Sequence, residues 1–250
     1  MRIQLIRSAT LRFEYAGMRF IIDPCLSAKH TMPSWAGISL NPMAELICSP
    51  LEVLEGTEMA IISHMHSDHF DSVAKKLLPK EMPILCQPED EPKIRDTGFF
   101  NMTPIEDRIT WKGITITRTP GQHGTGEVLQ EMGNVSGFVF QAEAEPTVYW
   151  TGDTIWCNAV KEVIEKMQPK IIFTHSCGAV WKNSTIVMDA TQTINLCHAA
   201  PNSTIIATHM DSFDHSTVTR EILRQYSEEN NVSSEKLLIP ADMQQYQFLV

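Results

Sequence analysis

The chain has 250 residues, of which 43% are hydrophobic and 20% are charged, a composition typical of a globular protein with a full core. Its formal net charge of −10 argues against nucleic acid as a partner, because phosphate binding needs a basic surface. No run of about 18 apolar residues is present, so we expect no membrane-spanning helix, and the first ten residues lack the apolar segment of a signal peptide. The six cysteines are scattered, so we expect free thiols and a cytoplasmic protein.

Alternating polar and apolar residues predict three β-strands at the start of the chain, over 3–7, 11–15 and 18–23. Residues 24–50 show no periodicity and contain several prolines and Trp35, so we expect a long loop. We favour a loop on the substrate side, with a surface excursion of no functional consequence as the equal alternative. The next predicted elements are a buried strand, a helix, a strand and a short helix, at 59–63, 71–78, 82–86 and 88–98.

Two more strands, at 108–111 and 114–118, precede a glycine-rich loop at 119–127. This loop lacks the Lys-Ser/Thr pair of a phosphate-binding loop, and no helical pattern follows it. The remaining predicted elements are strands at 136–142, 147–153, 170–175 and 203–209, helices at 155–167, 188–200 and 216–230, and apolar runs at 236–240 and 246–250. No linker divides this order, which predicts a single α/β domain over residues 1–250, with two β-sheets and helices on their outer faces.

The segment HMHSDH, directly after the strand at 59–63, places His64, His66, Asp68 and His69 within six positions. On an extended backbone His64 and His66 lie on the same side, because side chains alternate between the two faces. Asp68 and His69 fall where the chain turns towards the next helix, where they can address a second ion. Imidazole and carboxylate groups suit Zn²⁺, Fe, Mn²⁺ or Ni²⁺. Four such groups would be costly to bury unpaired, so the segment predicts a metal site.

Three further polar residues, His123, Asp153 and His209, each follow a strand-like run and open a loop. This placement would bring all three to one edge of the sheets. A single histidine after a strand is more often a hydrogen-bonded loop residue, so the argument rests on their joint position.

His175 and Cys177 follow the predicted strand at 170–175. His175 has two equal interpretations, a hydrogen-bond donor to the leaving group or oxyanion and a simple loop cap. Burial is the better interpretation of Cys177 and Cys157, because no group that would activate either thiol is evident. No role is assigned to the histidines in the long loop and in the helix-like stretches, namely His30, His198 and His215.

These motifs resemble those of the metallo-β-lactamase superfamily of metal-dependent hydrolases. HMHSDH is similar to its ligand motif and TGDT (151–154) to its later aspartate motif. The segments FIIDP (20–24), GQHG (121–124) and IIATHMDSF (205–213) make the chain similar to the branch that includes ascorbate-6-phosphate lactonase. One departure is Arg7-Ser8-Ala9, where relatives often have a Gly-His pair.

The resemblance implies a four-layer αβ/βα sandwich with a binuclear site at one edge. It implies a first ion held by His64, His66 and His123 and a second held by Asp68, His69 and His209, with Asp153 bridging both and Asp23 nearby. Two divalent ions, Zn²⁺ foremost, would supply a bridging hydroxide that attacks a small ester or lactone, with or without a phosphate group. Asp68 would orient this hydroxide and carry its proton, and His175 is the second candidate catalytic residue.

Three other functions remain open. The first is a phosphodiesterase or nuclease of the same superfamily; the acidic charge counts against a nuclease, while a small cyclic diester stays open as a substrate. The second is a metal-binding regulatory protein without turnover, and the third is an iron-dependent redox protein, although no flavin domain is evident. We expect a small-molecule substrate and no nucleic-acid or membrane partner, and leave a homo-oligomer open.

Overall fold

The computed structural model of the chain describes residues 1–248 and contains two seven-stranded mixed β-sheets. The first sheet has the order β16-β1-β2-β3-β4-β5-β6 and the second β15-β14-β11-β10-β9-β8-β7. The first is built from β1 (Arg2–Arg7), β2 (Thr10–Tyr15), β3 (Met18–Ile22), β4 (Met59–Ile62), β5 (Ile84–Cys86), β6 (Met102–Pro104) and β16 (Gln245–Gln247). The second is built from β7 (Arg108–Trp111), β8 (Ile114–Pro120), β9 (Ser136–Gln141), β10 (Val148–Trp150), β11 (Ile171–His175), β14 (Thr204–Thr208) and β15 (Leu237–Leu238).

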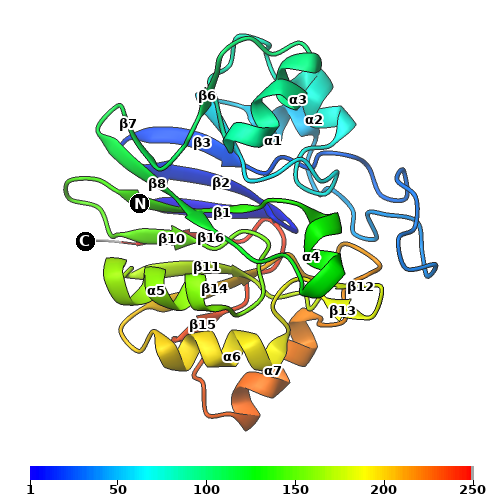
Figure 1. Cartoon of the computed structure of the whole chain (residues 1–250), viewed down its shortest axis with the longest axis vertical. Coiled ribbons are helices and arrows are strands. Elements are labelled where there is room, and N and C mark those ends of the chain that lie inside the picture. The colour runs from blue at the N-terminus through cyan, green and yellow to red at the C-terminus, as the bar shows by residue number, and fades with distance from the viewer. Residues whose placement is uncertain (249–250) are drawn as a thin grey trace.

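Helices cover the outer faces of both sheets (Figure 1). On the side of the first sheet lie α1 (Pro50–Leu54), α2 (Ser72–Leu77) and α3 (Glu91–Asp96), the last after the short 3-10 helix η1 (Pro88–Asp90). On the side of the second lie α5 (Asn158–Met167), α6 (Ala190–Ala199) and α7 (Arg220–Glu229). One edge carries α4 (Gly126–Met132) and the hairpin of β12 (Val180–Trp181) and β13 (Ser184–Thr185).

Apolar side chains fill the three spaces between these four layers. Between the sheets lies an aromatic core that includes Phe13, Phe20, Phe140 and Phe173. A second apolar cluster joins the first sheet to α1–α3, and a third joins the second sheet to α5–α7. The predicted sandwich of two mixed sheets flanked by helices is therefore confirmed.

Strand direction brings the ends of several strands to one edge. Strands β3 to β6 are parallel to one another, as are β10, β11, β14 and β15. Strand β8 runs in the same direction as β10, because both are antiparallel to β9. In Figure 1 the long loop that follows β3, helix α4 and the β12–β13 hairpin gather on the side opposite the N-terminus.

Two predictions about local structure are wrong. The first concerns helix α4, which follows the glycine-rich loop where the pattern predicts no helix. The pattern is weak there because α4 is short and Val128 is its only buried residue. His215 lies in a loop and not in a helix, because α7 begins at Arg220, after Thr219 caps it by accepting a hydrogen bond from the Ile222 N–H. The strands β6, β12 and β13 and helix α1 are not predicted. The last two residues of the predicted run 246–250 lie outside the described residues.

No helix in residues 1–248 has the length and apolar character needed to cross a membrane.

Candidate metal centre

The predicted metal ligands lie at the carboxyl ends of strands from both sheets, which meet at the same edge. Such an edge is where ligands bind in open α/β sheets. Four strand ends supply one histidine or aspartate each, and the end of β4 supplies the HMHSDH segment. In chain order these residues are Asp23 after β3, which is predicted to lie near the site and not as a ligand, and then the seven predicted ligands: His64, His66, Asp68 and His69 after β4, His123 after β8, Asp153 after β10, and His209 after β14.

One group of donor atoms comes from His64, His66 and His123, whose ring nitrogens lie within 4.8 Å of one another. The Nε2 of His64 lies 3.0 Å from the Nδ1 of His66. The carboxylate of Asp153 is adjacent, with its Oδ2 3.6 Å from His123 Nε2 and 3.9 Å from His64 Nε2.

A second group comes from His69, Asp153, His175 and His209, again within 4.8 Å of one another. The Nε2 of His69 lies 3.2 Å from both Asp153 Oδ2 and His209 Nε2. Asp68 joins this group from the side, with its Oδ2 3.3 Å from His209 Nε2 and 3.7 Å from His69 Nε2. Asp153 therefore lies between the two groups, in the position expected of a bridging carboxylate.

The spacing of these atoms fits divalent metal ions. Bonds of about 2.0–2.1 Å in tetrahedral geometry keep the ligand atoms of Zn²⁺ roughly 3.4 Å apart. The separations of 3.2–3.9 Å around Asp153 Oδ2 match this value. Ring nitrogens that face one another at 3.0 Å and 3.2 Å repel unless a proton or a cation lies between them. The structure thus brings all seven predicted ligands together, and their binding of metal stays a prediction.

Hydrogen bonds on the far side of three rings orient them towards the centre. The Nδ1 of His69 lies 2.8 Å from Asp23 Oδ2, and Asp23 in turn accepts hydrogen bonds from the N–H and Oγ of Ser63. The Nδ1 of His123 lies 2.9 Å from the Ile186 carbonyl oxygen, and that of His64 lies 3.0 Å from Ser63 Oγ. Such outer partners fix the tautomer and the orientation of metal-binding histidines.

Charge within the centre favours a cation. Burial opposes ionisation of Asp153 and Asp68, but the neighbouring His69 and His209 hold the pKa of both carboxyls well below the usual range. Burial likewise opposes protonation of His69, but Asp153, Asp68 and Asp23 outweigh it and raise its pKa to about 10. Buried carboxylates therefore attract positive charge to this point, as a site for divalent ions requires.

His175 contacts Asp153, with its Nδ1 2.5 Å from Asp153 Oδ1. Burial lowers the pKa of His175 to about 4, so the ring is neutral near pH 7 and its Nδ1–H donates to the carboxylate. This contact gives His175 a third role, which is to hold Asp153 in place. Donation to a leaving group stays a prediction, although His175 is not among the residues that line the adjacent cavity.

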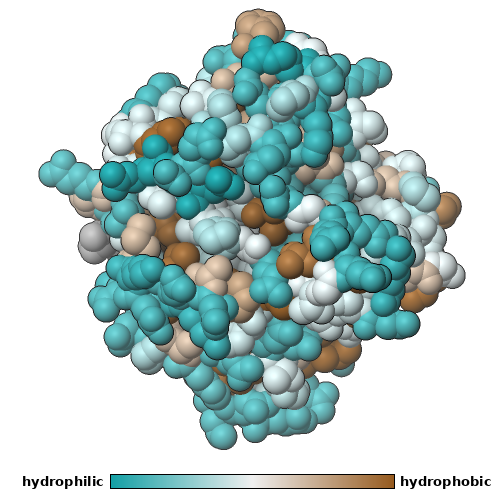
Figure 2. Space-filling view, viewed as in Figure 1, coloured by the Kyte–Doolittle hydropathy of each residue, from teal (hydrophilic) through white to brown (hydrophobic). Residues whose placement is uncertain are grey.

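A cavity of about 220 Å³ opens beside the centre. Its lining residues are of two kinds, polar ones that include predicted ligands and aromatic or aliphatic ones. The visible surface around this edge mixes hydrophilic and intermediate residues with small separate groups of hydrophobic ones (Figure 2). The lining residues are His66, Ser67, Asp68, His123 and Asp153 on the polar side, Trp35, Met132, Trp181 and Ile186 on the apolar side, and His215.

The apolar wall depends on residues that were not assigned a role from the sequence. Trp35 comes from the long loop at 24–50, which therefore does lie on the cavity side, and Trp181 comes from β12. His215 is buried, and this burial lowers the pKa of its ring, which is neutral near pH 7.

Asp214 holds the part of the loop that carries Trp35. Its carboxylate accepts hydrogen bonds from the N–H groups of Trp35 and Ala36, from Ser34 Oγ and from Asn41 Nδ2. Burial raises the pKa of Asp214, but these hydrogen bonds outweigh it and hold that pKa well below the usual range. The loop is thus fixed by one ionised side chain from the opposite end of the sequence.

Arg7 belongs to the segment Arg7-Ser8-Ala9, which stands where relatives often have a Gly-His pair, and the structure shows what its side chain does there. Its guanidinium is fully buried and donates to the carbonyl oxygens of Cys25, Ser27 and Ala44 at 3.0, 2.8 and 3.1 Å. The chain therefore uses the Arg7 guanidinium to join the start of the long loop, at Cys25 and Ser27, to a residue near its end, Ala44.

Comparison with known proteins identifies the family. The sequence matches the beta-lactamase superfamily domain over residues 18–210. The UPF0173 protein YddR of Bacillus subtilis is 35% identical over 99% of this chain and 100% of its own length. A UPF0173 metal-dependent hydrolase of Xanthobacter autotrophicus is 24% identical over 69% of this chain and 70% of its own length.

Two crystal structures match the fold over nearly the whole chain. An isothiocyanate hydrolase from Delia radicum gut bacteria has a TM-score of 0.95 at 34% identity, and the match covers 100% of both chains. A possible metal-dependent hydrolase from Veillonella parvula has a TM-score of 0.95 at 30% identity over 99% of both chains. The similarity to the lactonase branch stays a prediction, but the predicted superfamily is confirmed: the chain belongs to the metallo-β-lactamase superfamily and is a metal-dependent hydrolase.

Proposed function

We propose that this chain adds water to a small, uncharged electrophile that carries an apolar group, with isothiocyanates as the substrate class. The observation that carries this proposal is the cavity, which is lined both by predicted metal ligands and by the apolar side chains of Trp35, Trp181 and Met132. An apolar cavity of about 150 Å³ accommodates benzene, so about 220 Å³ is room for one ring with a short chain. The relative that is 34% identical over its whole length is an isothiocyanate hydrolase.

The charge of the cavity argues against the phosphorylated substrates that the resemblance allowed. Among the described residues that line it, no lysine or arginine is present, while Asp68 and Asp153 are. A phosphate group would meet carboxylates without a cationic side chain to pair with. An ester or lactone without phosphate is the alternative substrate that fits the same walls.

The residues of the centre would hold two divalent ions. One ion would be held by His64, His66 and His123 and the other by Asp68, His69 and His209, with Asp153 between them. Bound there, the ions would supply hydroxide at neutral pH and stabilise the negative charge that develops on the substrate.

Hydrolysis of an isothiocyanate then balances with one water. Addition of water to the central carbon of R–N=C=S forms a C–O bond and transfers a proton to nitrogen, which gives the thiocarbamate R–NH–C(=O)–SH. Cleavage of the C–N bond, with transfer of the remaining proton to nitrogen, gives the amine and carbonyl sulfide. Asp68 lines the cavity as an ionised carboxylate, so it can accept a hydrogen bond from the water and carry its proton to the substrate nitrogen.

A substrate panel tests this function. Protein purified without added metal is first analysed for its metal content, then assayed with phenyl and methyl isothiocyanate, phenyl acetate, γ-butyrolactone and bis(p-nitrophenyl) phosphate. We expect aniline release from phenyl isothiocyanate, abolished by a chelator and restored by Zn²⁺. Asp68→Asn should lower turnover by at least about 100-fold, whereas Asp96→Asn, on the exposed face of α3, should leave it unchanged.

Other outcomes would assign another function. Hydrolysis of the phosphodiester alone would identify a phosphodiesterase, and hydrolysis of phenyl acetate or the lactone alone would identify an esterase or lactonase. Tight metal binding without turnover of any member of the panel would contradict the proposed hydrolysis and favour a metal-binding protein.

A further inference from the structure

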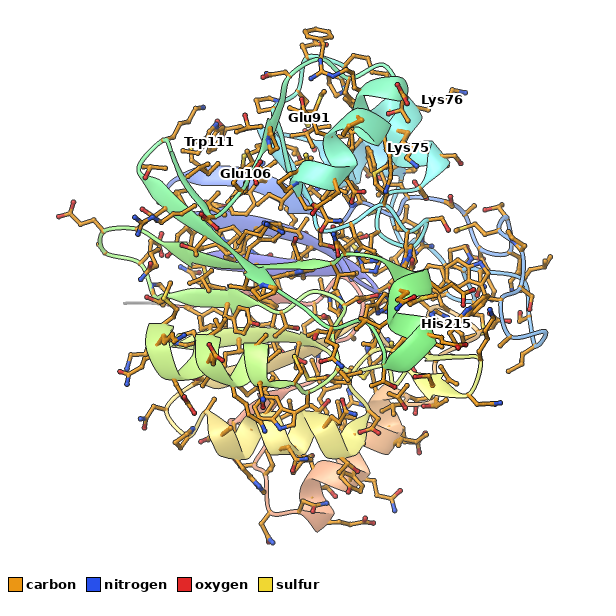
Figure 3. The ribbon with its side chains drawn as sticks, viewed as in Figure 1. Lys75, Lys76, Glu91, Glu106, Trp111 and His215 are labelled. Atoms are coloured by element: carbon orange, nitrogen blue, oxygen red, sulfur yellow. The ribbon has the colours of Figure 1, made fainter. Side chains whose placement is uncertain are left out.

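His215 lies in the loop between β14 and α7, at the edge that carries the candidate metal centre. Figure 3 shows it on the side of the molecule opposite the N-terminus, away from the labelled Lys75 and Lys76 on α2. It lines the same cavity as Asp68, His123 and Asp153, but it belongs to neither group of candidate metal ligands. Its function is therefore separate from that of the histidines that point at the centre.

Aromatic packing holds the His215 ring. The ring meets Trp35 edge to face, with centroids 4.9 Å apart and planes at 77°, and it lies 6.3 Å from the ring of Phe213. Trp35 in turn stacks on Phe213, with centroids 5.0 Å apart and planes at 5°. The backbone is fixed as well, because the His215 carbonyl oxygen accepts a hydrogen bond from the Val180 N–H at 3.0 Å. The imidazole is thus preorganised at the cavity wall.

The hydrogen-bonding capacity of this ring is unused. Only 9% of His215 is exposed, and within residues 1–248 its Nδ1 is buried without a hydrogen-bond partner. A buried polar group without a partner is costly, and in native proteins such an exception needs an explanation. His69 and His123, by contrast, each have an outer partner for the Nδ1 nitrogen. His215 lines a substrate-sized cavity, and its ring is held firmly and carries a nitrogen without a partner, which are properties of a ligand-contacting group.

We propose that His215 contacts the substrate and selects for it, by forming a hydrogen bond to the polar heteroatom of a substrate whose apolar group lies between Trp35 and Trp181. This inference rests on the proposed function. For an isothiocyanate, the heteroatom is the nitrogen, which gains an electron pair as the C–O bond forms and then accepts a hydrogen bond more strongly. Trp35 has two roles in this arrangement, since the same side chain lines the cavity and packs against the imidazole.

The test separates substrate contact from packing and from metal binding. His215→Phe keeps an aromatic ring against Trp35 and removes the hydrogen bond, whereas His215→Asn keeps a hydrogen-bonding group and loses the ring. His198→Phe, on the exposed face of α6, is the matched control. Each holoprotein is analysed for metal content and thermal stability, then titrated with phenylthiourea, a stable compound that joins a phenyl ring to an N–C=S group, with tryptophan fluorescence as the readout.

We expect the wild type to bind phenylthiourea, His215→Phe to weaken binding by about 10- to 100-fold, and His215→Asn to restore part of it, all at unchanged metal content. The kcat/KM for phenyl isothiocyanate should fall in parallel. Equal affinity of wild type and His215→Phe for phenylthiourea would overturn the assignment, as would absence of binding to the wild type. Failure of the wild type to hydrolyse isothiocyanates contradicts the proposed function instead, and the binding measurement still decides the role of His215.

Discussion

Replacement of Asp214 by asparagine should loosen the loop that carries the cavity wall. The Oδ1 of this carboxylate accepts hydrogen bonds from the Trp35 N–H at 3.0 Å and from Asn41 Nδ2 at 2.9 Å. Its Oδ2 accepts from Ser34 Oγ, from the Ala36 N–H at 3.1 Å and from the N–H groups of Ile38 and Ser39, both at 3.3 Å. An asparagine side chain retains one oxygen, and its amide nitrogen cannot accept. With that oxygen in the Oδ2 position, which has four donors, the two donors to Oδ1 lose their acceptor.

The free-energy cost follows from this count of lost acceptors. A hydrogen bond to a charged group contributes about 1.5–3 kcal/mol, and water can reach part of this loop, so the lower value applies to each donor. Two lost bonds then destabilise the protein by about 3 kcal/mol. For a chain of this size each kcal/mol lowers Tm by about 2–4 °C, so Tm should fall by roughly 6–12 °C.

The effect should also depend on pH in a definite direction. Because the pKa of Asp214 is lowered in the folded state, its contribution to stability is fully present above the unfolded-state pKa of about 3.9. It is lost as the pH falls through the lower folded-state pKa. The difference in Tm between wild type and Asp214→Asn should therefore be large at pH 7 and shrink below about pH 4.

Thermal unfolding followed by circular dichroism at pH 7, 5 and 3.5 measures this difference, with Asp96→Asn as the control. In the same variant, KM for phenyl isothiocyanate should rise while the metal content is unchanged, because Trp35 moves and the candidate ligands do not. Equal Tm values at pH 7, or a difference that persists undiminished at pH 3.5, would refute the role given to the carboxylate.

Three further changes address the centre and its walls. Gly152→Ala should lower stability by more than about 1 kcal/mol, because Gly152 has a φ of +67° and the new Cβ would meet the Ser136 carbonyl oxygen. It should also reduce metal content, because the next residue is the candidate ligand Asp153. Gly17→Ala, at a φ of +75° with nothing within 4 Å, is the control in thermal unfolding and elemental analysis, and equal metal content in the two variants would contradict this expectation. Asp23→Asn should weaken metal binding by about 10- to 100-fold, measured in competition with a chelator, because His69 loses the carboxylate that orients its ring. Unchanged metal affinity would exclude this orienting role of Asp23. In steady-state kinetics, Trp181→Ala should raise KM by about tenfold for phenyl isothiocyanate and far less for methyl isothiocyanate, since only the larger group reaches the apolar side chains of the cavity. An equal effect on both substrates would contradict a contact between Trp181 and the substrate.

Strand positions and the polar residues after them could be predicted because both depend on local pattern. The alternation in β2 and β8 and the apolar run of β4 reflect which faces of those strands are buried. His64, His66 and His69 could be recognised from their density within one segment. The placement of His123, Asp153 and His209 at the same edge followed from the rule that strand-end residues meet when their strands run in the same direction.

The cavity wall could not be predicted, because it depends on packing between distant segments. Trp35 reaches the wall because Asp214, about 180 residues later in the chain, holds its loop, and no local pattern connects the two. The sequence pattern places His215 in a helix-like stretch, but α7 begins only at Arg220, because Thr219 is its N-cap. Helix α4, which brings Met132 to the wall, is too short to produce a recognisable periodic pattern.

The spread of the centre along the chain has a consequence for biosynthesis. His69 and His209 lie 140 residues apart, yet their ring nitrogens meet at 3.2 Å. At a translation rate of about 5–20 residues per second, the ribosome needs roughly 7–28 s to add the chain between them. During that interval Asp68 and His69 are present without His209, so a nascent chain would lack one of the three residues proposed to hold the second ion. If the proposed assignment holds, the ion assigned to Asp68, His69 and His209 would thus be loaded late, after the arrival of β14, whereas the ligands of the other ion are complete once His123 has emerged.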